Sequence, residues 1–195
     1  MNVPFSTEEF LGVLVEYNQA VWPMQIVLVA LAVLIIALAW NGSWNGSGRR
    51  GNLVAGGLGL FWIWMGVVYH FAFFTGINKA AWGFGALFVV QGLLFLYEGA
   101  MAGRFSVGLE AGGTRWLAAV LFLYALVIYP LLGHLLGHRY PQSPTFGLPC
   151  PTTIFTFAVL LVARSPVPKR LLVIPLLWSV IGFGAALKFG IYQDV

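Results

Sequence analysis

Long apolar runs alternate with short polar segments along almost the whole chain. Six runs are long or apolar enough to be membrane spans, at about residues 22–40, 52–74, 80–102, 114–136, 147–163 and 171–189. A helix needs about 20 apolar residues to cross a hydrocarbon core of about 30 Å. Because backbone groups in lipid must find partners within their own segment, the runs indicate helices. The pattern predicts an all-α, polytopic transmembrane helical bundle of about six spans, with residues 1–195 as a single membrane domain.

Composition and charge place this bundle in a membrane. Hydrophobic residues make up 60% of the chain and charged residues 8%, against about 25% charged residues in soluble domains. Seven basic residues fall on one side of the predicted bundle: Arg49, Arg50, Arg104, Arg115, Arg164, Lys169 and Arg170. The other side has Lys79, Arg139 and Lys188. Since basic loops stay in the cytoplasm, we expect both termini outside, as for a bacterial inner-membrane protein. The basic residues form no stripe, so no nucleic-acid partner is expected.

A short amphipathic segment, Ser6 to Tyr17, precedes the first run. Ser6 and Glu9 have the spacing of a capping box, which satisfies free N–H groups at a helix start. Apolar residues follow on one face, namely Phe10, Leu11, Leu14 and Val15. The segment is either an N-terminal helix lying in the membrane interface or an early extension of the first span.

Glycines recur every seven residues in the third run, at Gly85, Gly92 and Gly99. Small residues allow helix backbones to approach closely in a membrane, so this face should contact another helix. Gln91 and Glu98 border the stripe and should face protein as intramembrane polar residues. An acidic residue within a span suggests function by default, but a local ion pair or an escape to the interface also explains Glu98.

The segment 134–153 holds two histidines, an arginine, a tyrosine, four prolines and the only cysteine. We expect its polar groups to line one outward-facing, ligand-binding pocket because the topology places them at one membrane depth. The candidate ligand-binding residues are His70, His134, His138, Arg139, Tyr140, Cys150, Thr152 and Thr153. Arg139 would suit an anionic or carbonyl-bearing ligand, since its planar guanidinium donates hydrogen bonds in pairs.

Metal binding and catalysis find little support in this segment. His134 and His138 have the i, i+4 spacing that zinc enzymes use, but no complete metal signature is present. Hydrogen bonds to carbonyls or to interfacial water also explain these histidines. Cys150 cannot form an intrachain disulfide, and a catalytic thiol needs a positioned base. We therefore expect no metal and no cofactor, and lean against an enzyme.

The run 147–163 is short for a span, and Pro149 and Pro151 fall in its first turns. Proline is tolerated at a helix start. The extended backbone before it survives in a membrane only where protein buries it or where it lines a watery cavity. Residues 138–153 therefore either fold back into the outer mouth of the bundle or form a plain loop before a short tilted helix.

Several stretches resemble a bacterial family of multi-pass membrane proteins with no assigned function. They are Tyr17-Asn18, Trp22-Pro23, Gln25, WMGVVYHFAFFTGIN at 64–78, GALFVVQGLLFL at 85–96, GHRYPQSPTFGLPCPTTIFTF at 137–157 and LLVIPLLW at 171–178. The resemblance covers most of the chain and implies a bacterial inner-membrane helical protein, without implying any chemistry.

Three classes of function remain open. The first is small-solute transport, a channel or binding through the outward-facing pocket, with a small-molecule ligand. The second is an accessory subunit, in a homo-oligomer or a larger membrane complex, that packs through its glycine faces. The third is a membrane enzyme or a metal- or cofactor-bearing redox protein built on the outer His and Cys residues. The scarcity of intramembrane charges disfavours a driven ion transporter.

Overall fold

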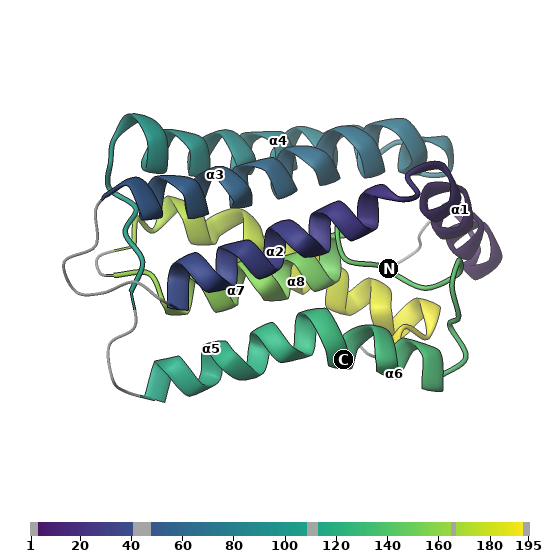
Figure 1. Cartoon of the computed structure of the whole chain (residues 1–195). Coiled ribbons are helices and arrows are strands. Elements are labelled where there is room, and N and C mark those ends of the chain that lie inside the picture. The colour runs from purple at the N-terminus through teal and green to yellow at the C-terminus, as the bar shows by residue number, and fades with distance from the viewer. Residues whose placement is uncertain (1–3, 41–47, 109–112, 165–166, 193–195) are drawn as a thin grey trace.

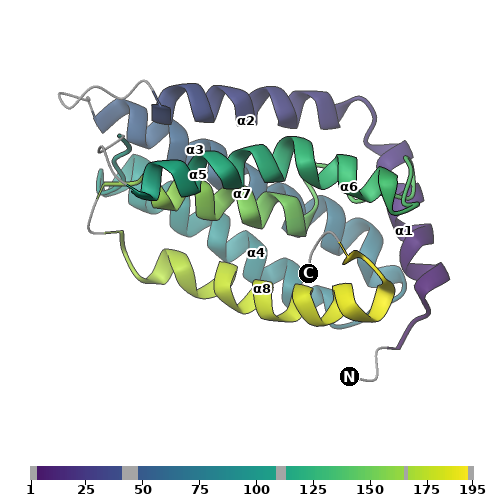
Figure 2. The same ribbon diagram turned by 90° about the horizontal axis from the view of Figure 1, so that it is seen from below.

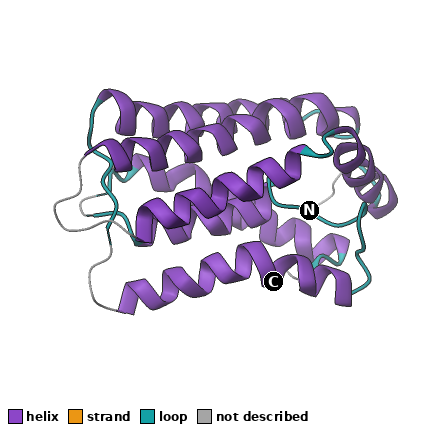
Figure 3. Ribbon diagram, in the orientation of Figure 1, coloured by secondary structure: helices purple, strands orange, loops and turns teal. Residues whose placement is uncertain are grey.

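The computed structural model describes residues 4–40, 48–108, 113–164 and 167–192, and over these residues the fold is all helical, as predicted (Figure 3). The α-helices are α1 (Thr7–Ala20), α2 (Met24–Trp40), α3 (Gly48–Trp64), α4 (Ala81–Leu96), α5 (Gly113–Leu123), α6 (Tyr129–Leu135), α7 (Pro149–Leu161) and α8 (Arg170–Phe189). Widened π-helical turns continue α3, α4 and α5, namely η1 (Met65–Phe73), η3 (Tyr97–Met101) and η4 (Tyr124–Ile128). A turn of 3-10 helix, η2 (Phe74–Gly76), follows η1. Helices α2 to α8 run lengthwise beside one another, and α1 lies across one end (Figures 1 and 2).

The number of candidate spans is smaller than predicted. Among the described residues, four helical segments are long and apolar enough to cross a membrane: Gly48–Gly76, Ala81–Gly99, Thr114–Leu135 and Arg170–Phe189. The pair α1 and α2 gives a fifth if it is counted as one span bent by 83°. The prediction of six is wrong because α2 has only 17 residues and α7 only 13. The bend also excludes α1 as a straight extension of α2.

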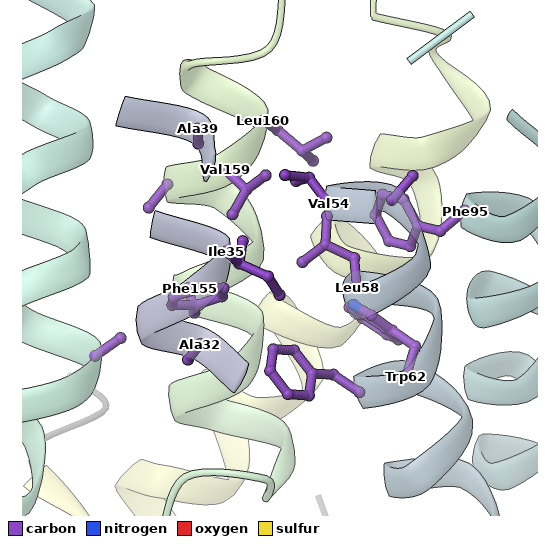
Figure 4. Packing of buried hydrophobic residues seen from close by; sticks show 14 of the residues in the cluster. Ala32, Ile35, Ala39, Val54, Leu58, Trp62, Phe95, Phe155, Val159 and Leu160 are labelled. Atoms are coloured by element: carbon purple, nitrogen blue, oxygen red, sulfur yellow. The ribbon is translucent and has the colours of Figure 1, made fainter. Parts of the chain in front are cut away.

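Helix α7 is short because it lies at the centre of the bundle. Nine of its 13 residues are buried, including Phe155 and Val159. These two side chains pack beside Ala32 and Ile35 of α2, with Leu58 of α3 opposite (Figure 4). Helices α5 and α8 also contact α7. A helix covered by its neighbours does not have to match the thickness of a bilayer, so 13 residues suffice.

Helices α3 and α4 meet through glycines, which confirms the predicted contact face. A Cβ atom added to Gly92 would lie 2.7 Å from the carbonyl oxygen of Gly59, and one added to Gly59 would lie 2.9 Å from the carbonyl oxygen of Gly92. A Cβ atom added to Gly85 would meet the side-chain ring of Phe71 in η1. Because real Cβ atoms do not approach so closely, the two backbones can touch only where both residues are glycine.

Polar contacts join α4 to the first turn of α8. Pro175 has no N–H group, so the carbonyl of Leu171 lacks its usual donor in the helix. The Gln91 amide nitrogen donates to this carbonyl at 3.0 Å. Seven residues further along, in η3, the buried Glu98 carboxylate forms an ion pair with Arg170. Both polar residues therefore face protein, and the ion partner of Glu98 lies on another helix.

The ends of the bundle differ in charge. The Arg164 amide nitrogen donates to Ser106 at 2.8 Å, and the Arg115 guanidinium lies 4.9 Å from the centroid of the Trp40 ring. The first contact joins the segments that follow η3 and α7, and the second joins the start of α5 to the end of α2. All four segments lie at the end of the bundle opposite α1 (Figure 1). The seven basic residues counted above all lie in or beside these segments.

At the other end, Ser6 and Glu9 form the predicted capping box of α1. The Ser6 N–H donates to the Glu9 carboxylate at 2.7 Å, and the Glu9 N–H donates to the Ser6 hydroxyl oxygen at 3.1 Å. Hydrogen bonds with Ser6 hold the pKa of the Glu9 carboxyl group below its ordinary value, and the bond with the Ser6 backbone has a larger effect than the bond with its side chain. The carboxylate therefore supports the start of α1 at neutral pH, and this support is lost as the pH falls through the lowered pKa.

Candidate functional site

The buried side chain of Asn18 fastens the first part of the loop between α6 and α7 to α1. Its amide nitrogen donates to the carbonyls of Pro141 at 2.7 Å and Ser143 at 2.8 Å. Its amide oxygen accepts from the Thr145 hydroxyl at 2.7 Å. A single asparagine thus satisfies backbone groups that have no partner in a helix or strand, which is what allows extended chain to be buried.

The last part of this loop descends into the bundle. The Tyr17 hydroxyl donates to the Gly147 carbonyl at 3.4 Å and accepts from the Trp64 indole nitrogen at 2.8 Å. The Gly147 N–H donates to the Thr152 hydroxyl oxygen at 3.1 Å. Gly147 has a φ of 98°, which favours glycine. Of the two interpretations of residues 138–153, the observed arrangement is the one that folds back into the end of the bundle.

Beneath α1 lies a partly open cavity of about 300 Å³. It is bounded by α1 and the residues before it, the η1–η2 turn, the start of α4, the start of α7 and the second half of α8. Its lining is mostly apolar and includes Phe5, Phe10, Leu14, Phe74, Phe84, Leu148, Cys150, Trp178, Ile181, Gly184, Ala185, Ala186, Phe189 and Ile191. Apolar cavities of about 150 Å³ stay dry and bind benzene, so this one is large enough for an organic molecule.

Aromatic rings close the cavity on the side of α1. The ring of Phe189 stacks on those of Phe5 and Phe10, with centroids 5.3 and 4.8 Å apart. Phe74 meets Phe5 edge-on at 5.4 Å. These contacts belong to the second apolar cluster of the protein, which is separate from the main core around α7. Helix α1 is therefore the cover of a small aromatic chamber.

Few polar groups line this chamber. Tyr69, which is 4% exposed, is one of them. The indole nitrogen of Trp178 is buried without a hydrogen-bond partner in the described part of the chain. Lys188, which is exposed, is the one charged side chain among the described lining residues. The arrangement suits a molecule with a large apolar part and a small polar one.

His70 lies just behind the wall of the cavity and not on its lining. It is fully buried in the π-helical turn η1, and neither ring nitrogen has a hydrogen-bond partner among the described residues. Aromatic rings surround it, those of Tyr69, Phe74, Phe84, Phe88 and Trp178. Four of these rings, all except that of Phe88, also line the cavity, so a change in the position of the imidazole would alter the shape of the chamber.

The other candidate residues are spread around the same end of the molecule. Cys150 lines the cavity and, with Thr153, a smaller one of about 110 Å³. His134 and Arg139 are exposed and His138 is partly buried. Tyr140 is 52% exposed and donates to the Asn18 carbonyl, while Thr152 binds the backbone of the loop. Within the described cavities the structure does not bring His70 together with His138 or Arg139. No group of three potential metal ligands occurs among the described residues.

The residues that form the chamber were missed from the sequence because they are phenylalanines, a tryptophan and small residues. A signal was present: Gly182, Gly184, Ala185 and Ala186 fall together in α8, where small side chains leave space beside a helix. A further groove of about 320 Å³ runs between α2 and α6. It is a weaker candidate because its lining includes the exposed Ile26 and Val29.

Over the residues that the structure describes, the protein is helical, with four to five candidate membrane spans and an apolar cavity beneath an end-capping helix. The chain belongs to DUF6064, a family of unknown function, which it matches over residues 7–195. Neither a comparison with curated proteins nor one with solved structures gave a match.

Proposed function

We propose that this protein is an integral membrane protein that binds a small, mostly apolar molecule in the chamber beneath α1. The main support for this proposal is the chamber itself, which has a volume of about 300 Å³ and a largely aromatic wall. Small-molecule sites are typically concave, mostly apolar pockets of about 300–1,000 Å³. An apolar pocket of this size is therefore best explained by a ligand that fills it.

The outer surface supports the membrane assignment. Large apolar side chains are exposed along the candidate spans, for example Leu93 at 53%, Val120 at 56% and Val180 at 72%. On α2 the outward face is as apolar as the inward one. Soluble monomers rarely expose continuous apolar surfaces beyond a few hundred Å². A bilayer would cover these side chains and supply apolar ligands from its own interior.

The charge difference between the two ends supports an orientation. We place the basic end in the cytoplasm of a bacterium and α1, with both termini, outside the inner membrane. Single cysteines introduced at Arg139 and Arg104 in a Cys150→Ser background test this, because both arginines are exposed. An impermeant thiol reagent should label the first in intact cells and the second only after permeabilisation. The reverse pattern would overturn the orientation.

Photolabelling tests the binding site. A decanol derivative with a diazirine on its chain is equilibrated with the protein in lipid nanodiscs, and labelled peptides are mapped after irradiation. Gly184 lines the cavity, and a Cβ atom added there meets nothing within 4 Å. Gly184→Leu should therefore fill the space without unfolding the protein. We expect labels on Phe84 and Ile181, and a loss of most labelling in Gly184→Leu.

Val180→Leu is the matched control, because Val180 lies on the same helix but is 72% exposed and does not line the cavity. It should label like the wild type. Labels confined to outward-facing residues, or equal labelling of Gly184→Leu and the wild type, would refute a binding site in the chamber.

A further inference from the structure

We infer that the chamber binds a single-chain carboxylate amphiphile, with its chain inside and its head group at Lys188. This rests on the proposed binding function and names the class of ligand. The chamber is elongated along α8, since its lining residues run from Trp178 to Phe189. At 1.5 Å per residue, Lys188 and Trp178 are about 15 Å apart along the helix. A slender chain fits this shape better than a compact ring system.

The size of the chamber sets the length of the chain. A cavity of about 150 Å³ accepts benzene, so about 300 Å³ accommodates on the order of a dozen carbon atoms. The small residues Gly184, Ala185 and Ala186 leave this space free on α8. An acyl chain of medium length matches the volume, whereas a two-chain phospholipid does not.

The charge of the head group follows from Lys188. Its ammonium lies 5.9 Å from the centroid of the Phe189 ring. It forms no ion pair with any described residue, and no acidic side chain is among the described lining residues. A cation at the rim of an apolar cavity favours an anionic group on the ligand. Placing that group deeper, beside Trp178, would be unfavourable because a charge would leave water without a charged partner.

A carboxylate fits this position better than a phosphate monoester. The one ammonium balances the single charge of a carboxylate. A phosphate monoester carries about −1.5 to −2 charges at neutral pH, so part of its charge would stay unbalanced beside an apolar wall. The neighbouring groups that could help, Tyr69 and Asn78, are both uncharged donors and acceptors.

Competition against the photoprobe tests the inference. Decanoate, decanol and decyl phosphate are titrated at pH 8 into nanodiscs that hold the wild type, Lys188→Gln or Lys188→Arg. Their concentrations in the bilayer are measured, so that partitioning is accounted for. Decanoate should compete about two- to fivefold better than decanol in the wild type, the range of a partly exposed ion pair. Lys188→Gln should remove this preference without weakening decanol, and Lys188→Arg should keep it.

Lys79→Gln is the control for a general loss of positive charge, because Lys79 does not line the cavity; it should keep the preference for decanoate. Equal competition by decanoate and decanol in the wild type would overturn the inference and leave the proposed function intact. A preference for decyl phosphate that depends on Lys188 would overturn the carboxylate assignment. Failure of all three compounds to compete would refute the proposed function as well.

Discussion

The glycine contact between α3 and α4 gives a prediction with a control on the same helix. Gly59→Ala and Gly92→Ala each add one methyl group at the contact. The added Cβ atoms would lie 2.9 and 2.7 Å from backbone carbonyl oxygens of the facing helix. Gly56→Ala adds the same group to α3 three residues earlier, where a Cβ atom meets nothing within 4 Å.

Two opposing effects set the magnitude. Replacing glycine by alanine inside a helix stabilises it by about 1 kcal/mol. Forcing an extra carbon into a packed contact costs about 1–3 kcal/mol, and the upper part of that range applies because a backbone oxygen cannot rotate away. We expect Gly56→Ala to raise the free energy of unfolding slightly. Gly59→Ala and Gly92→Ala should each lower it by about 1–2 kcal/mol.

The double variant sharpens the test. Once one methyl group has separated the helices, the second has less to displace, so the two losses should not add. Thermal unfolding in a mild detergent, followed by circular dichroism, measures all four variants. If Gly92→Ala unfolds at the same temperature as Gly56→Ala, the α3–α4 contact is not the one described. Fully additive losses would show that the two glycines do not face each other.

Two polar contacts also give predictions about stability. Asn18→Leu leaves buried loop carbonyls without a donor and should lower the free energy of unfolding by about 2–4 kcal/mol. Tyr140→Phe removes one partly exposed hydrogen bond and should lower it by under about 1 kcal/mol. Equal effects of the two substitutions in a denaturant titration would argue against Asn18 as the residue that holds the loop. Gln91→Leu should cost about 1–3 kcal/mol because it leaves the Leu171 carbonyl unpaired. Adding Pro175→Ala should recover part of that loss by restoring an N–H donor within α8, and no recovery would contradict the role given to Gln91.

Much of the fold follows from local patterns in the sequence. The capping box at Ser6 and Glu9, the glycine stripe that contains Gly92, and the helix at 170–189 all depend on residues close together in the chain. The role of α7 could not be predicted in the same way. Its length of 13 residues is visible in the sequence, but whether lipid or protein surrounds a short helix depends on its neighbours.

The candidate site shows a second limit of sequence patterns. A topology predicted from the sequence gives the end of the bundle at which each polar residue lies but not the direction in which its side chain points. His70 and His138 belong to the same end of the bundle, yet one is buried among aromatic rings and the other lies at the loop. The chamber depends on α1 folding back over α8, a contact between Phe10 and Phe189 that is distant in sequence. Phenylalanines at such positions are indistinguishable from ordinary core residues.

One measurement tests the central claim, that the chamber beneath α1 holds a ligand, most directly. Crystals of the protein grown with decanoate brominated at the end of its chain would locate the bromine by anomalous diffraction. We expect a single strong peak between Trp178, Phe84 and Ile181, and its loss in Gly184→Leu. A chamber filled by its own side chains, or bromine found only on the outer surface of the helices, would contradict it.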